Sequence, residues 1–171
     1  MEFRLGGSEA VAPLYTPEQR ARRDASRWTL VQGILAPLQF LVFLVSAALV
    51  LRYLATGEGW AVASASVVIK TLVLYSIMVT GSLWEHDVFG QYLFAPAFYW
   101  EDVVSMLVLA LHTAYLVALT TGVVGYREQM LLALAAYAAY VVNATQFLLK
   151  LRAARQQRPR VNGAAVAAGA E

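Results

Sequence analysis

The chain has 171 residues, of which 60% are hydrophobic and only 14% are charged, and its net charge is +2. Soluble domains usually carry about 25% charged residues, so this composition predicts a single-domain integral membrane protein. The chain has no cysteine, which excludes disulfides, iron–sulfur clusters, thioether-linked haem and thiolate zinc sites. The small net charge also argues against a nucleic-acid-binding protein.

Residues 15–28, YTPEQRARRDASRW, predict a short basic helix before the first apolar block. Thr16 is expected to cap this helix, with Pro17 in its first turn and Gln19 completing a capping box. We expect the helix to end at Trp28 and to anchor the chain at the membrane surface rather than to bind a ligand.

Four apolar blocks follow, and each is long enough to cross a membrane, because a spanning helix needs roughly 20 apolar residues. They lie at about residues 30–53, 60–84, 103–122 and 129–149. The predicted fold is therefore all-α, a polytopic membrane protein built as a bundle of four transmembrane helices. This single membrane domain covers residues 14–155, between tails at residues 1–13 and 156–171 that are expected to be disordered.

Basic side chains flank the first and the last of these spans. Four arginines lie close before the first span, namely Arg20, Arg22, Arg23 and Arg27. Five basic residues follow the fourth span, namely Lys150, Arg152, Arg155, Arg158 and Arg160. Because basic residues favour the cytoplasmic side of a membrane, the N and C termini are both expected to be cytoplasmic. The connection at residues 85–102 then lies on the cytoplasmic side as well.

This connection is acidic and aromatic. The segment 82–102, SLWEHDVFGQYLFAPAFYWED, carries four carboxylates and no lysine or arginine. Aromatic side chains at the membrane surface are typical of an interfacial belt, but such a belt needs no carboxylates. The uniform negative charge raises the pKa of any acid that is buried there.

The two Trp-Glu pairs of this segment stand where the second and third spans reach the surface. Glu85 and Glu101 are therefore expected to face each other, whereas Glu101 and Asp102 diverge by about 100° on a helix. A protonated carboxyl group beside an ionised one, enclosed by aromatic rings, would be an acid–base pair at neutral pH.

Polar residues inside the spans are costly in a bilayer, so each is a candidate site. Lys70 is expected to face the bundle interior and to pair with an anion, a carbonyl group or a ligand carboxylate. His112 is expected either to bond to a neighbouring group or to bind a ligand, on one helix face with Glu101, about 16 Å along the axis. Further polar residues suit interhelical hydrogen bonds or ligand contacts, namely Gln32, Gln39, Asn143 and Gln146.

Five strings of the sequence together resemble the 3-vinyl (bacterio)chlorophyllide hydratases of anoxygenic phototrophs. They are LYTPEQRARRD, WTLVQGILAPLQFLVFLVS, VFGQYLFAPAFYWEDV, LALHTAYLVAL and AAYVVNATQFLLKL, and the resemblance covers about residues 14–155. It implies addition of water to the C3 vinyl group of chlorophyllide a or bacteriochlorophyllide a, to give the 3-(1-hydroxyethyl) product on the route to bacteriochlorophyll a. It also implies a multi-pass protein of the bacterial inner or intracytoplasmic photosynthetic membrane.

Hydration of such a vinyl group needs a proton on the terminal carbon and then water on the cation that the macrocycle stabilises. We expect Glu101 to be the acid and Glu85 its partner, with Asp102 as the substitute for either. The substrate-binding candidates are His112, Lys70, Gln39, Gln91, Tyr99, Trp100, Asn143 and Gln146.

Among these candidates, His112 is a possible ligand of the substrate's magnesium, and Lys70 or a terminal arginine could hold the propionate. No cofactor or metal of the protein's own is expected, since the substrate carries the magnesium. The expected partners are the pigment and the lipid bilayer, with a second copy of the chain or a neighbouring pathway enzyme left open.

Three other classes of protein stay open at this point. A non-catalytic pigment-binding or assembly subunit of the photosynthetic membrane would use the same histidine and aromatic residues. A haem b or quinone protein is disfavoured, because His86 and His112 lie about 15 Å apart in depth on the basis of helical rise. A proton-coupled carrier using Lys70 would usually show an internal repeat, which the sequence lacks.

Overall fold

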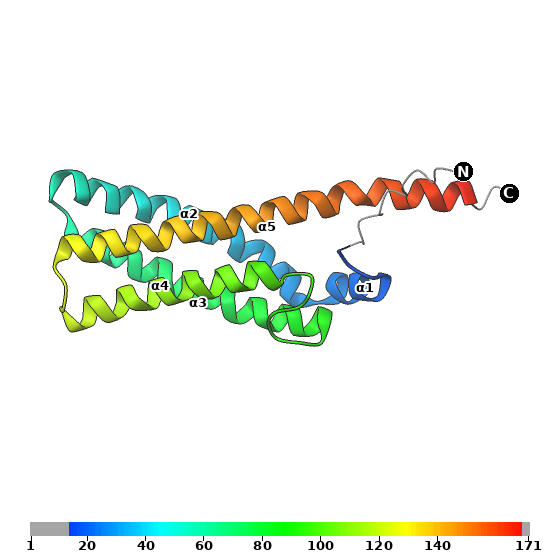
Figure 1. Cartoon of the computed structure of the whole chain (residues 1–171), viewed down its shortest axis with the longest axis horizontal. Helices are drawn as coiled ribbons and strands as arrows, with labels where there is room; N and C mark the ends of the chain where they lie inside the picture. Colours follow the sequence, from blue (N-terminus) through cyan, green and yellow to red (C-terminus); the bar gives the residue numbers. More distant parts are fainter. Residues whose placement is uncertain (1–13, 169–171) are drawn as a thin grey trace, which may run out of the picture.

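The computed structural model describes residues 14–168, with side chains described up to residue 153, and the described part of the chain is helical, as predicted (Figure 1). Its helices are α1 (Pro17–Ala25), α2 (Arg27–Thr56), α3 (Trp60–Phe89), α4 (Tyr99–Thr121) and α5 (Tyr126–Ala168). The tail predicted at residues 1–13 lies outside the described residues. The tail predicted from residue 156 coincides with the last part of α5, which continues as a helix to Ala168.

Four of these helices, α2 to α5, are long and apolar enough to cross a membrane, which confirms the predicted spans. Helix α2 packs most extensively against α3, and α4 packs most extensively against α5. The short turns at residues 57–59 and 122–125 lie at one end of the bundle. Helix α1 and the connection 90–98 lie together at the other end (Figure 1). The acidic segment and the basic N-terminal helix therefore share one end of the molecule.

The beginning of the described chain follows its local sequence signals. The Thr16 hydroxyl accepts a bond from the Gln19 amide at 3.2 Å, and the Gln19 side chain accepts one from the Thr16 amide at 2.9 Å, which confirms the capping box. The predicted end of this helix at Trp28 is wrong. Ser26 is extended and caps α2 by accepting a bond from the Trp28 amide at 3.3 Å, so Trp28 lies in the first turn of α2.

The interior of the bundle is partly polar. On α4 the buried residues form one stripe, namely Glu101, Asp102, Ser105, Val108, His112, Tyr115 and Ala118. This stripe confirms that Glu101 and His112 share one face of the helix. Large apolar side chains cover the outer faces of the helices, as expected where the solvent is lipid.

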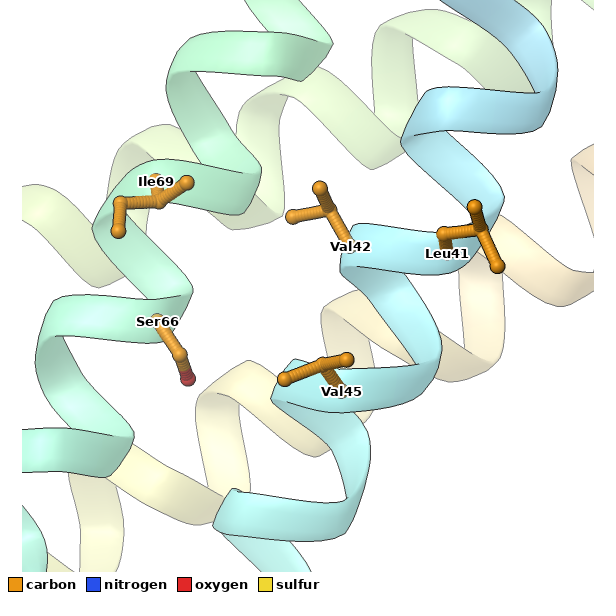
Figure 2. Close-up of a pocket in the computed structure, with 5 residues that line it drawn as sticks. All are labelled: Leu41, Val42, Val45, Ser66 and Ile69. Atoms are coloured by element: carbon orange, nitrogen blue, oxygen red, sulfur yellow. The ribbon is translucent and has the colours of Figure 1, made fainter.

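An open cavity of about 250 Å³ lies between α2 and α3 (Figure 2). Its lining is almost wholly apolar and consists of Leu41, Val42, Val45, Ser66 and Ile69. The Ser66 hydroxyl is already bonded to the Ser46 hydroxyl at 2.7 Å. None of the predicted site residues lines this cavity.

Candidate active site

Three of the four carboxylates in the acidic segment are buried. Glu85 and Glu101 are each 5% exposed and Asp102 is 4% exposed, whereas Asp87 lies at the surface and accepts a bond from the Ser26 hydroxyl at 2.7 Å. Glu85 comes from the end of α3, and the other two buried acids come from the first turn of α4. The ends of these two helices therefore gather the acids, which are not the solvated groups of an interfacial belt.

Glu85 meets Asp102 rather than Glu101. The carboxyl groups of Glu85 and Asp102 are close enough to influence each other, whereas Glu101 is paired with Lys150. This differs from the predicted pairing because α4 begins at Tyr99, so Glu101 and Asp102 both lie in its first turn. Consecutive helical residues diverge by about 100°, and Asp102 points towards α3 while Glu101 points towards α5.

Two consecutive backbone amides of the connection 90–98 hold this carboxyl pair. The Phe94 amide donates to Asp102 Oδ2 at 2.7 Å, and the Ala95 amide donates to Glu85 Oε2 at 3.3 Å. Phe94 adopts a left-handed backbone conformation with φ of 61°, which is uncommon for a residue other than glycine. Successive amides in such a conformation form a concave anion-binding arrangement.

The pair can hold and release one proton. Two neighbouring buried carboxylates repel each other when both are ionised, which favours a proton on one of them. The two amides stabilise the single negative charge that then remains. Such a pair behaves as one unit that gives up and takes back a proton.

Sequence reasoning did not identify Lys150 as part of this site. Its ammonium group lies 2.5 Å from Glu101 Oε2 and also donates to the Ala97 carbonyl oxygen. Lys150 therefore supplies a counter-charge, from α5, to a segment that contains no basic residue of its own. The signal was present in the sequence, because Asn143, Gln146 and Lys150 recur at intervals of three and four along one helix face.

The aromatic side chains near the acids divide into two groups. The first packs inside this end of the bundle and consists of Tyr15, Trp84, Phe89, Phe98 and Phe147. Burial raises the pKa of the Tyr15 hydroxyl, and the nearby Arg23 guanidinium partly opposes this effect. The second group is exposed at the surface and consists of Tyr92, Phe94, Tyr99 and Trp100.

Three of the exposed rings lie next to one another. The Phe94 and Tyr99 ring centroids are 5.8 Å apart, and those of Tyr99 and Trp100 are 5.5 Å apart. Phe94 is bonded to Asp102 through its amide, and Trp100 directly precedes Glu101. These three rings form an exposed aromatic surface suited to a flat apolar ligand. Gln91 is also exposed and bonds to the Leu93 carbonyl oxygen at 3.2 Å.

Lys70 and His112 form a separate group in the middle of the bundle. Both are completely buried, and the Lys70 ammonium lies 4.0 Å from the centre of the Tyr140 ring. Within the described residues, neither Lys70 Nζ nor His112 Nε2 has a hydrogen-bond partner. Lys70 precedes Glu85 by fifteen residues on α3, which corresponds to about 22 Å along the helix axis. The structure therefore does not bring these residues together with the carboxyl pair.

Two of the amide side chains inside the spans connect helices. Asn143 Nδ2 donates to the Ser105 hydroxyl at 2.8 Å, which joins α5 to α4, and Gln32 Nε2 donates to the Thr80 hydroxyl at 2.7 Å, which joins α2 to α3. Gln39 is buried and Gln146 is half-buried. These contacts agree with the interhelical alternative for the polar pairs of the spans.

A family model described as 2-vinyl bacteriochlorophyllide hydratase matches residues 15–153. The chain belongs to this family. A relative from Cereibacter sphaeroides named 2-vinyl bacteriochlorophyllide hydratase is 72% identical over 142 residues, covering 83% of this chain and 88% of the relative. A relative of the same name from Rhodobacter capsulatus is 68% identical over 144 residues, covering 84% of each chain. No solved structure matches the chain significantly.

Membership of the hydratase family confirms the resemblance seen in the sequence. The chain is a hydratase, a hydro-lyase of bacteriochlorophyll biosynthesis, and its apolar helices make it a multi-pass membrane protein. The matched region includes both the buried carboxyl pair and Lys150. This family favours a catalyst over a pigment-binding subunit, a haem or quinone protein, or a carrier.

Proposed function

We propose that this hydratase adds water to the C3 vinyl group of a bacteriochlorophyllide or chlorophyllide, with Glu85 and Asp102 together as proton donor and acceptor. The relatives' name supplies the substrate class. One observation carries the assignment of residues: two buried carboxyl groups from α3 and α4 accept bonds from two consecutive backbone amides, which holds them close to each other.

The carboxyl pair accounts for both proton transfers. Its proton passes to the terminal vinyl carbon, which leaves a cation on the carbon attached to the macrocycle. The macrocycle delocalises this cation, water adds to it, and the surplus proton of that water returns to the ionised pair. One water is consumed and the pair ends as it began. The reaction needs no redox cofactor, and the only metal is the magnesium that the substrate carries.

Glu101 is not the group that we propose to donate the proton. Its carboxylate lies 2.5 Å from the Lys150 ammonium, so it is already engaged in an ion pair. In this proposal Asp102 takes the place of Glu101 in the acid–base pair, and Glu85 remains one of its two members.

We propose that the macrocycle lies against the exposed rings of Phe94, Tyr99 and Trp100, beside the pair. His112 is ten residues beyond Asp102 on α4, about 15 Å along the axis, and is completely enclosed. For this reason we assign Lys70 and His112 to the packing of the bundle rather than to the substrate.

We propose that the end of the bundle that carries the carboxyl pair faces the cytoplasm. The protein would then lie in the bacterial inner or intracytoplasmic photosynthetic membrane. The arginines before and within the first turn of α2 support this orientation, because basic residues favour the cytoplasmic side. Cytoplasmic water and soluble pigment would then reach the same end of the molecule.

The test compares turnover of four variants in membranes supplied with the vinyl pigment, followed by the blue shift that accompanies loss of vinyl conjugation. Glu85→Gln and Asp102→Asn should each lower turnover by about 100-fold or more, the usual effect of removing a general acid. Glu101→Gln should retain clearly more activity than either. Asp87→Asn is the matched control, since it removes an exposed carboxylate two residues from Glu85.

Pigment binding, measured by fluorescence in the same membranes, should persist in Glu85→Gln. Turnover near that of the wild type in Glu85→Gln or Asp102→Asn would contradict the assignment. An equal loss in Asp87→Asn would also contradict it, because any carboxylate of the segment would then serve.

A further inference from the structure

We infer that Lys150 is a positioning residue for the hydration, which pairs with Glu101 and seats the connection 90–98 over the Glu85–Asp102 pair. This inference rests on the proposed function. It concerns a residue that the reaction does not touch directly, because Lys150 contacts Glu101 and the backbone rather than either member of the pair.

The contacts of Lys150 are all made with the segment that covers the pair. Its ammonium group bonds to Glu101 Oε2 and to the Ala97 carbonyl oxygen, and it lies 5.0 Å from the centre of the Phe98 ring. The side chains of Lys150 and Glu101 are 26% and 7% exposed, so the ion pair is largely enclosed. Enclosed pairs of this kind are costly to break when only one partner is removed.

Three side chains, those of Glu85, Asp102 and Lys150, hold the connection through its backbone. The amides of Phe94 and Ala95 donate to the two carboxyl groups of the pair, and the carbonyl oxygen of Ala97 accepts from Lys150. Each charge therefore meets the backbone group of complementary polarity. Without Lys150, the side of the connection next to α4 loses its anchor.

Lys150 also supplies the counter-charge for the Glu101 carboxylate, which is next to Asp102 in the chain. Glu101 and Asp102 are neighbours in the chain, so an uncompensated Glu101 carboxylate would compete for the proton of the pair. At this end Arg23 pairs with Asp24, and Asp87 accepts a bond from the Ser26 hydroxyl. Lys150 is thus the basic side chain that compensates the buried acids among the described residues.

The test is a double-variant cycle in native membranes, with kcat and KM measured for each variant. Lys150→Met and Glu101→Gln should each lower kcat about tenfold, a typical coupling for members of one salt-bridge network. The double variant Glu101→Gln/Lys150→Met should recover most of this loss, because both uncompensated charges disappear together. Lys150→Arg should keep near-normal kcat, since it preserves the positive charge.

The control is Arg152→Met, which removes an exposed cation two residues further along α5 and should leave kcat unchanged. A double variant as slow as Lys150→Met would overturn the inference. It would also be overturned if Lys150→Met raised KM for the free-acid pigment but not for its methyl ester, since Lys150 would then bind the substrate. Full activity of Glu85→Gln contradicts the proposed function instead, so the two failures are distinguishable.

Discussion

Phe94 allows the strain of the active-site connection to be separated from the role of its ring. A side chain in the left-handed region costs about 1–2 kcal/mol, because its Cβ lies too close to the carbonyl oxygen that follows. Phe94 has φ of 61° and its side chain is 40% exposed. Replacement by glycine removes the strain and the ring together, whereas replacement by leucine removes the aromatic ring alone.

The magnitudes predict different effects of the two variants on the free energy of unfolding. Phe94→Gly relieves the strain but loses the contact with Tyr99, worth about 0.5–1.5 kcal/mol for an aromatic pair, so its free energy of unfolding should stay near that of the wild type. Glycine also gains backbone freedom in the unfolded chain, which offsets about 0.5–1 kcal/mol of the benefit. Phe94→Leu should be destabilised by about 1 kcal/mol, because it loses the contact with Tyr99 and gains no relief of the strain.

Unfolding in detergent micelles, followed by circular dichroism, measures stability, and the absorption assay measures turnover on the same preparations. Phe94→Gly should fold as stably as the wild type yet show a raised KM, because the proposed macrocycle contact has gone. Phe94→Leu should raise KM to a similar extent. The reasoning is refuted if glycine is clearly less stable than leucine here, or if neither variant changes KM.

Two further predictions concern residues away from the carboxyl pair. Lys70→Met should increase the free energy of unfolding by about 1–3 kcal/mol and leave turnover unchanged, because it removes a buried amine that has no hydrogen-bond partner within the described residues. A lower stability would contradict this prediction. Thr16→Ala should cost α1 about 1 kcal/mol through loss of its cap, and trypsin should then cut sooner at the arginines of α1, with Ser8→Ala as the control.

The spans and the polar stripe of α4 could be predicted because they depend on local composition and helical periodicity. The capping box at Thr16 is likewise a signal contained in four consecutive residues. The end of the first helix was misjudged, because Ser26 both ends α1 and caps α2 within a single residue.

The pairing of the acids could not be obtained from spacing alone. It depends on α4 beginning at Tyr99, which turns Asp102 towards Glu85, and on α5 bringing Lys150 to Glu101 from 49 positions further along the chain. The left-handed conformation of Phe94 is also set by these tertiary contacts, since phenylalanine has no local preference for it. Such contacts between distant segments carry no periodic signal in one sequence.

The most direct measurement of the proposed chemistry is infrared spectroscopy of the resting protein at neutral pH, without substrate. The spectrum of each variant is subtracted from that of the wild type. A protonated carboxyl group absorbs as a carbonyl band that is separate from ionised carboxylates. We predict one such band, lost in Glu85→Gln and in Asp102→Asn but retained in Glu101→Gln. A spectrum without that band, or a band that vanishes only in Glu101→Gln, would contradict a proton shared by Glu85 and Asp102.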